Sequence, residues 1–331
     1  MFRTSLVGAC IAALAWNAAA APADAPESAR LYVTSVASSL VEQGLAAPAP
    51  SGPETATFEK LNGPSIRMFN NVAQATTAPW VEANAWRFQR GLKNAYYENL
   101  AVGSAVPAAA EAFAFNVEAI LNPDPADIPE LGRFLGILKT QQRALLPTMA
   151  NIGVMDDKSP RLDEVLNMLT RRNLLYRVVS APDRNLDLTV QLGSKDFPLE
   201  SAANPSDFAA RVREKLSDDK RLVRLYGTST VIAHLTGDGK RAQLYLLSYT
   251  RAGGRGQGGA GRGQQGGGGT GGGGTQPIRI RLLGRYQPVK FAAYRAAEAA
   301  QLIDVENLGS STEFSVPAFS TLAIIDLQIT K

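Results

Sequence analysis

The sequence predicts an α/β region followed by an all-β region. Between residues 31 and 216, short apolar segments of strand length alternate with segments whose apolar residues recur at helical spacing. This order is typical of parallel strands joined by crossover helices. From Arg221 onward, apolar segments follow one another with only turn residues between them, which indicates a small antiparallel β-sandwich.

The first part of the α/β region alternates strands with helices. One helix begins near Ala105, because Pro107 suits a first helical turn and is followed by alanine, glutamate and phenylalanine. A later helix is indicated by apolar residues at helical spacing. Residues 91–103 are predicted to form a loop. The predicted strands are 31–33, 65–69, 80–88 and 118–121, and the predicted helices are 36–43, 105–115 and 126–142.

A complete βαβ unit is predicted between residues 150 and 179. An apolar strand at 150–155 ends before Asp156, and Ser159 and Pro160 then cap and begin a helix. This helix should run to Arg172 with its leucines facing inward, and the second strand follows at 174–179. Another helix is expected to start at Asn204-Pro205.

The all-β region contains consecutive predicted strands. Gly237-Asp238-Gly239 predicts a hairpin turn. Residues 253–275 are so rich in glycine that they cannot bury enough apolar area to offset their ordering entropy, so we expect a disordered loop. The alternative is an arginine-glycine segment that binds nucleic acid. The segment has only two arginines, which does not favour this alternative. The predicted strands are 221–226, 229–236, 241–249, 277–286, 302–306, 312–316 and 321–329.

The first 21 residues have the layout of a secretory signal peptide. Arg3 precedes an apolar run from Leu6 to Trp16, which is too short to span a bilayer, and small residues follow. Lipid attachment at Cys10 is an alternative to ordinary cleavage. We therefore expect a periplasmic or secreted protein without a membrane span after cleavage. Its predicted divisions are a signal peptide at 1–21, an α/β domain at 22–145, a second α/β unit at 146–220 and a β-sandwich at 221–331.

Composition narrows the chemistry that is available. Cys10 is the only cysteine and lies in the predicted signal, which excludes disulfides, thiol nucleophiles and thiolate metal sites from the mature chain. His234 is the only histidine and is expected to be an ordinary strand residue. Chemistry then depends on carboxylates, and we expect no metal and no cofactor. The net charge of +4 is small and the basic residues are scattered, which does not favour nucleic acid as a partner. The sequence leaves open whether the chain forms homo-oligomers.

Residues 80–88 form the most unusual predicted strand. Side chains alternate faces along a strand, so Trp80, Glu82, Asn84 and Trp86 would share one face. Two indoles that flank a carboxylate and an amide are suited to binding a sugar. In the alternative interpretation the indoles are core residues and Glu82 is a buried, hydrogen-bonded glutamate.

Asp124 is the second candidate carboxylate, because it follows the predicted strand 118–121 directly. A Glu82–Asp124 pair could serve glycoside hydrolysis, which needs carboxyl groups roughly 5 Å apart for retention or about 6.5–9.5 Å apart for inversion. The alternative for Asp124 is a helix-start residue within Asn-Pro-Asp-Pro. Asp156 and Asp157 have a similar alternative as helix-capping residues, and Glu111 is expected to pair locally within its helix.

Several segments resemble the later parts of large glycoside-hydrolase-like proteins: WVEANAWRF, AAAEAFAFNVEAILNPDP, NIGVMDD with VLNMLTRRNLLYRVV, and TEFSVPAFSTLAIIDL. In such proteins, which include some beta-galactosidases, a (β/α) barrel precedes an amidotransferase-like, flavodoxin-like α/β unit and a β-sandwich. The resemblance implies a barrel in 22–145. A complete barrel needs about 200 residues, so this one would be partial. Without a cysteine, amidotransferase activity is excluded.

Two functions follow from the resemblance and the residues. The first is an exported protein that acts on or binds carbohydrate, with Glu82 as general acid or nucleophile, Asp124 as its partner, and Trp80, Asn84 and Trp86 binding the sugar. The second is a non-catalytic carbohydrate-binding protein, or a structural envelope protein, with a degenerate barrel.

Overall fold

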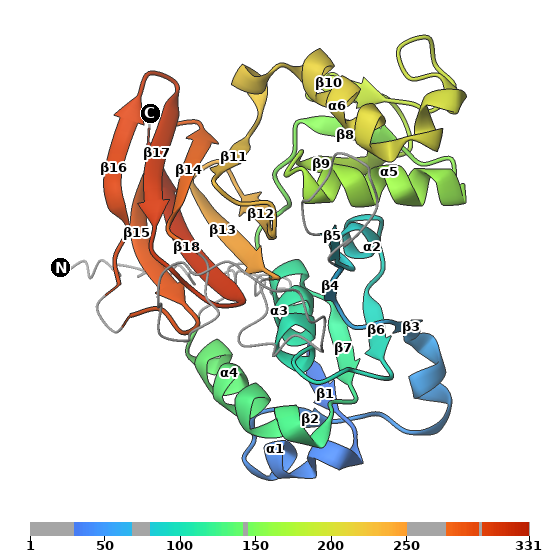
Figure 1. The fold of residues 1–331 in the computed structure, drawn as a ribbon, viewed down its shortest axis with the longest axis vertical. Coiled ribbons are helices and arrows are strands. Elements are labelled where there is room, and N and C mark those ends of the chain that lie inside the picture. Colours follow the sequence, from blue (N-terminus) through green and yellow to red (C-terminus); the bar gives the residue numbers. More distant parts are fainter. Residues whose placement is uncertain (1–29, 68–79, 142–144, 250–275, 298–299, 331) are drawn as a thin grey trace, which may run out of the picture.

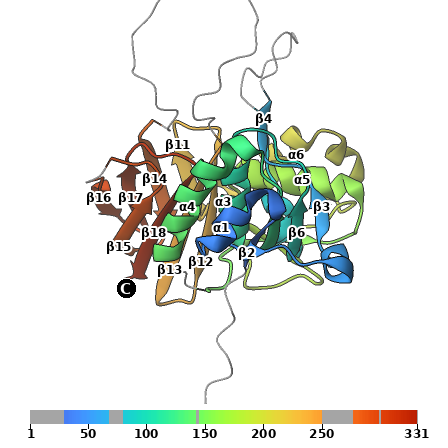
Figure 2. The same ribbon diagram turned by 90° about the horizontal axis from the view of Figure 1, so that it is seen from below.

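The computed structural model describes residues 30–67, 80–141, 145–249, 276–297 and 300–330 (Figure 1). The predicted signal peptide and the predicted glycine-rich loop lie outside these residues. The described chain forms a parallel α/β region, a smaller α/β unit and a β-sandwich. Seen from below, the sandwich and the unit that contains α5 and α6 lie on opposite sides, with α3 and α4 between them (Figure 2).

Five parallel strands form the first sheet, in the order β2-β1-β7-β6-β3. The last strand, β7, pairs with the first, β1, as happens where a (β/α) barrel closes on itself. The strands β2 and β3 are the edges of the described sheet, so the barrel is partial, as predicted. The strands are β1 (Leu31–Val33), β2 (Ala47–Pro48), β3 (Glu59–Leu61), β6 (Asn94–Tyr97) and β7 (Glu118–Leu121).

Two helices of this region, α1 and α3, pack against the parallel strands. The 3-10 helix η2 lies in the short connection between the edge strands β2 and β3. Six of the eleven residues of α3 are alanine, and these small buried side chains let the helix lie between β7 and β13 (Figure 1). The helices are η1 (Ser35–Ala37), α1 (Ser38–Glu42), η2 (Gly52–Thr57), α2 (Ala85–Gln89), α3 (Ala105–Phe115), η3 (Pro125–Asp127) and α4 (Ile128–Thr140).

The second unit contains the predicted βαβ motif. The strands β8 (Ile152–Met155) and β9 (Tyr176–Val179) are parallel and are joined by α5 (Pro160–Arg171). Ser159 caps α5 by accepting a hydrogen bond from the Leu162 amide at 3.2 Å. Sequence analysis missed the third strand, β10 (Leu188–Val190), which pairs with the other edge of β8. The remaining helices are η4 (Leu199–Ala203), α6 (Pro205–Leu216) and η5 (Asp218–Lys220).

Two antiparallel sheets form the predicted β-sandwich. Their orders are β11-β14-β17-β16 and β12-β13-β18-β15, and apolar side chains from both sheets form one buried core. The strand β15 was not predicted, because the predicted strand at 277–286 runs across a turn where Gly284 has φ of 118° and β15 begins. The strands are β11 (Val223–Tyr226), β12 (Val231–Gly237), β13 (Arg241–Ser248), β14 (Ile278–Leu283), β15 (Tyr286–Ala293), β16 (Ile303–Leu308), β17 (Ser311–Val316) and β18 (Leu322–Ile329).

The prediction of one strand over 80–88 is wrong. Only β5 (Trp80–Glu82) is extended, and it pairs with β4 (Ser65–Arg67) in a separate two-stranded antiparallel sheet. The chain then turns into α2. This helix buries Phe88 in the core of the first region and Trp86 in the core of the second unit. Because α2 lies between two cores, its alternating apolar residues imitate the pattern of a strand.

The predicted loop at 91–103 is likewise wrong in part, because it contains β6 in the middle of the parallel sheet. Within the described ranges, no helix combines the length and the apolar character that a membrane crossing requires.

Candidate functional site

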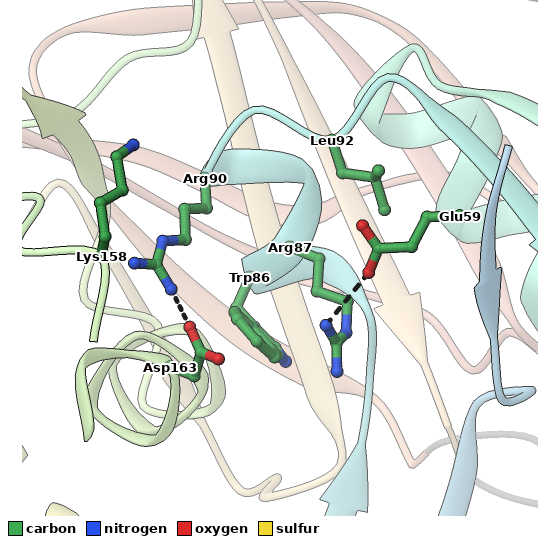
Figure 3. A pocket seen from close by; sticks show the side chains of 7 residues that line it. All are labelled: Glu59, Trp86, Arg87, Arg90, Leu92, Lys158 and Asp163. Atoms are coloured by element: carbon green, nitrogen blue, oxygen red, sulfur yellow. Dashed lines mark hydrogen bonds and ion pairs between the residues drawn. The ribbon is translucent and has the colours of Figure 1, made fainter. Parts of the chain in front are cut away.

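A cleft of about 280 Å³ lies where α2 meets the second unit (Figure 3). Its lining comes from three parts of the chain: the edge strand β3, the segment around α2, and the start of α5 with the loop before it. Most of the lining side chains are charged, and Trp86 lies between the two carboxylates in Figure 3. The lining residues are Glu59, Trp86, Arg87, Arg90, Leu92, Lys158 and Asp163.

Arg90 is the ionic centre of one wall. Its guanidinium donates to Asp156 at 2.7 Å and also contacts Asp163, and Lys158 contacts the same Asp156. Burial alone would raise the pKa of Asp156, but hydrogen bonds from Arg90 and Lys158 outweigh burial and lower the pKa to about 2. These ion pairs join the end of α2 to the start of α5.

The opposite wall is more loosely held. Arg87 faces Glu59 at 3.4 Å, and about half of the Glu59 side chain is exposed. The Arg87 guanidinium also lies over the Trp86 ring, 4.3 Å from its centroid. An exposed ion pair of this length is worth about 0–1 kcal/mol, so a ligand could displace Arg87 at small cost.

Of the predicted sugar-binding residues, only Trp86 lines the cleft. Trp80 is partly exposed but packs against the core of the second unit, and the Arg171 guanidinium lies 3.5 Å from its ring centroid. Asn84 is almost fully buried and donates to the carbonyl of Asn62 at 3.0 Å. The three side chains therefore do not share one strand face.

The two predicted catalytic carboxylates belong to different sheets. Glu82 ends β5 and accepts a hydrogen bond from Ser65 at 2.7 Å. Asp124 follows β7 as predicted, and its carboxylate accepts the Ala126 amide at 2.9 Å at the start of η3. Asp124 thus has the helix-start role that was its alternative. The prediction that the strand of Glu82 and the strand before Asp124 are neighbours in one parallel sheet is wrong.

A second polar group of residues is fully buried around Glu111. Its carboxylate accepts hydrogen bonds from Tyr249 at 2.6 Å, from the Asn84 amide at 3.0 Å and from Tyr97 at 3.1 Å. Burial raises the pKa of Glu111 to about 7, although these donors oppose the increase. Glu111 therefore joins α3 to α2, β6 and the end of β13, and the expectation that it pairs locally is wrong.

His234 agrees with its predicted role as a buried strand residue. Its ring lies 4.2 Å from that of Phe115 and contacts Tyr245 on the neighbouring strand.

Most residues that line the cleft were not predicted from the sequence. Arg87 and Arg90 are three residues apart, a spacing that places side chains on one helix face, but the helix itself was interpreted as a strand. Glu59 lies on a strand that was not predicted, and Lys158 and Asp163 reach the cleft only through the tertiary fold. A helical interpretation of residues 85–90 would have placed Arg87 and Arg90 near each other.

No protein-family model matches the chain, and no curated protein is similar to it. Among solved structures, alpha-L-fucosidase isoenzyme 2 from Paenibacillus thiaminolyticus has 9% sequence identity and a TM-score of 0.47, with 69% of this chain covered. A cold-adapted beta-galactosidase from Rahnella sp. R3 has 10% identity and a TM-score of 0.40, with 74% covered. A GH42 beta-galactosidase from G. stearothermophilus has 8% identity and a TM-score of 0.32, with 80% covered.

The chain spans 57% of the length of the first two of these structures and 53% of the third. Each of these likenesses is partial. The observed order of a partial barrel, a parallel α/β unit and a β-sandwich is the order that the sequence resemblance implies.

Proposed function

We propose that this protein binds carbohydrate in the cleft beside α2 and does not hydrolyse it. The observation that carries the proposal is the composition of the cleft: one indole, with charged donors and acceptors on both sides of it. Sugar sites combine a flat apolar surface with a few fixed polar groups. Arg90 and Asp163 provide fixed groups, because their ion pairs hold them in place.

Only 8% of Trp86 is exposed and the Arg87 guanidinium lies over its ring, so a sugar ring that stacks on Trp86 must first displace Arg87. Its ion pair with Glu59 is worth about 0–1 kcal/mol. A cation–π contact at an exposed site adds about 0.5–1 kcal/mol. Displacement therefore costs about 0.5–2 kcal/mol, and the freed guanidinium and carboxylate can then form hydrogen bonds with sugar hydroxyls.

The carboxylates of the cleft support binding rather than hydrolysis. A general acid must hold a proton for the leaving group. Hydrolysis needs two such carboxyl groups, and Asp163 instead faces the Arg90 guanidinium, an ion pair that stays in place when a sugar displaces Arg87. The alternative is a glycoside hydrolase in which Glu82 is the acid or nucleophile and Asp124 its partner.

A glycan array tests the binding proposal with wild type, Glu59→Gln and Lys158→Ala. Each substitution removes one exposed charge from the cleft, and we expect about threefold to tenfold weaker binding of the retained glycans. The matched control is Glu98→Gln, since Glu98 is an exposed glutamate that pairs with Lys60 and does not line the cleft. Binding that is absent in wild type, or equal in all four proteins, contradicts the proposal.

A panel of chromogenic glycosides separates binding from hydrolysis. We expect no turnover by wild type. Turnover that disappears in Glu82→Gln or Asp124→Asn would replace the proposal with the hydrolase alternative. Turnover that disappears only in Glu59→Gln or Asp163→Asn would place the reaction in the cleft.

Export is part of the same proposal, supported by the arrangement of charge and apolar residues in 1–21. Amino-terminal sequencing of the chain recovered from the periplasm of a Gram-negative host should give a mature start near Ala21. A chain that keeps Met1 and stays in the cytoplasm contradicts export.

A further inference from the structure

A cluster of arginines lies where the second unit continues into the β-sandwich. The chain leaves α6, passes through η5 and enters β11, which pairs with β14 (Figure 1). This path brings together guanidinium groups from the end of the helix and from two neighbouring strands. The cluster consists of Arg213, Arg221, Arg224 and Arg281, with Asp218 among them.

Three of these guanidinium groups converge on one carboxylate. Arg213 donates to Asp218 at 2.6 Å, Arg221 lies 3.5 Å from it, and Arg224 lies 3.7 Å from it. Arg213 above all, through its hydrogen bond, lowers the pKa of Asp218 to about 2. A single ionised carboxylate therefore faces three permanent positive charges.

Arg281 adds a fourth charge that no described carboxylate neutralises. Its guanidinium instead donates to a backbone carbonyl, that of Asp219, at 3.5 Å. It stands directly across from Arg224 in the β11–β14 ladder. Glu313, its partner on the other side, forms its ion pair with Arg279 instead.

The cluster also contains buried donors without an acceptor. Within the described residues, Nη1 of Arg281 and Nε of Arg221 are buried and have no hydrogen-bond partner. Like charges that face each other across a ladder destabilise a sheet, and a buried unpaired donor adds to the cost. An anion bound beside these groups would offset both effects.

We propose that Arg213, Arg224 and Arg281 bind a tetrahedral oxyanion, either free sulfate or phosphate or a sulfate ester on a saccharide. The planar fork of a guanidinium matches two oxygens of such a group, and several forks can share one anion. About half of the Arg213 side chain is exposed, so the ligand can approach from solvent on that side. Asp218 competes with the anion for the same guanidinium groups, which keeps the affinity for the anion moderate.

Isothermal titration of the full chain with sodium sulfate and sodium phosphate tests the site, with sodium chloride as the reference at equal ionic strength. We expect saturable binding of the oxyanions in wild type and at least tenfold weaker binding in Arg281→Gln and Arg224→Gln. Arg224→Lys keeps the charge without the fork and should give an intermediate loss. Asp218→Asn removes the competitor and should bind several-fold more tightly.

Arg211→Gln is the matched control, because Arg211 is an exposed arginine on α6 outside the cluster, and its affinity should equal that of wild type. Thermal unfolding of each variant verifies that it is folded. A sulfated polysaccharide and its desulfated form distinguish the two sources of the anion. If the sulfated polysaccharide binds more tightly than inorganic sulfate, and Arg281→Gln loses this binding, the ligand is a sulfate ester. If only the inorganic ions bind, the ligand is a free anion. Absent saturable binding, or equal binding in the arginine variants and wild type, overturns the proposal.

Discussion

Glu111→Gln should remove a pH dependence of stability that one buried carboxyl group creates. The Glu111 side chain is fully buried, and its pKa rises from 4.5 to about 7 on folding because burial disfavours the charged form. Glutamine has nearly the same shape and stays neutral. It can keep the hydrogen bonds from the Asn84 amide and one tyrosine while the other tyrosine rotates its hydroxyl to accept.

The magnitude follows from the pKa change. Each pKa unit corresponds to about 1.4 kcal/mol, so a rise from 4.5 to about 7 corresponds to about 3 kcal/mol. The folded pKa is the higher one, so the folded state binds the proton more tightly than the unfolded state. This contribution to stability is complete below pH 4.5 and is lost as the pH rises to about 7.

The assay is denaturant unfolding of wild type and Glu111→Gln between pH 4.5 and 8, followed by intrinsic fluorescence. Other carboxylates contribute equally to both proteins, so they cancel in the difference between the two free energies of unfolding. As the pH rises from 4.5 to 8, the free energy of unfolding of Glu111→Gln should increase by about 3 kcal/mol relative to that of wild type. A difference that stays constant within about 0.5 kcal/mol would refute the assignment. Tyr249→Phe removes the shortest hydrogen bond to the Glu111 carboxylate. Because that bond stabilises the charged form, its loss should raise the folded pKa of Glu111 and extend the pH dependence of stability to higher pH.

Three further predictions concern local contacts. Asp156→Asn should lower the free energy of unfolding by about 1–2 kcal/mol at pH 7. Because the pKa of Asp156 is depressed to about 2, the stability difference between wild type and variant should shrink as the pH falls from 4 to 2. A stability difference that stays constant in acid denaturation curves would contradict this prediction. Ser159→Ala should cost about 1 kcal/mol by removing the cap of α5, with Ser159→Asp restoring most of it in thermal unfolding. Asp124→Ala should cost about 1 kcal/mol through η3 and leave glycan binding unchanged; loss of binding without loss of stability would contradict the capping role.

Strong local patterns made much of the fold predictable. The β8-α5-β9 unit was predicted because an apolar strand, a serine cap and helical spacing agree over neighbouring residues. The hairpin at Gly237-Asp238-Gly239 was predicted because its turn residues define it. The order of parallel and antiparallel regions followed from the same signals.

The remainder depends on contacts between distant residues. The helix α2 buries side chains in two different cores, so its apolar residues do not follow a single helical stripe. The strand β6 is short and follows a glycine turn, and only its neighbours in the sheet identify it. Glu111 takes one donor from 138 residues away, a partner that no local pattern of the sequence indicates.

The pairing of β1 with β7 also has a kinetic consequence. A hydrogen bond between Thr34 and Asn122 spans 88 residues at this seam, so the first strand stays without its partner until β7 has been synthesised. Contacts of such long separation close slowly, because the entropy of the intervening loop is lost before they form. During translation, the edge of β1 that later receives β7 therefore stays unpaired, and a chaperone that binds exposed strands should engage this amino-terminal segment first.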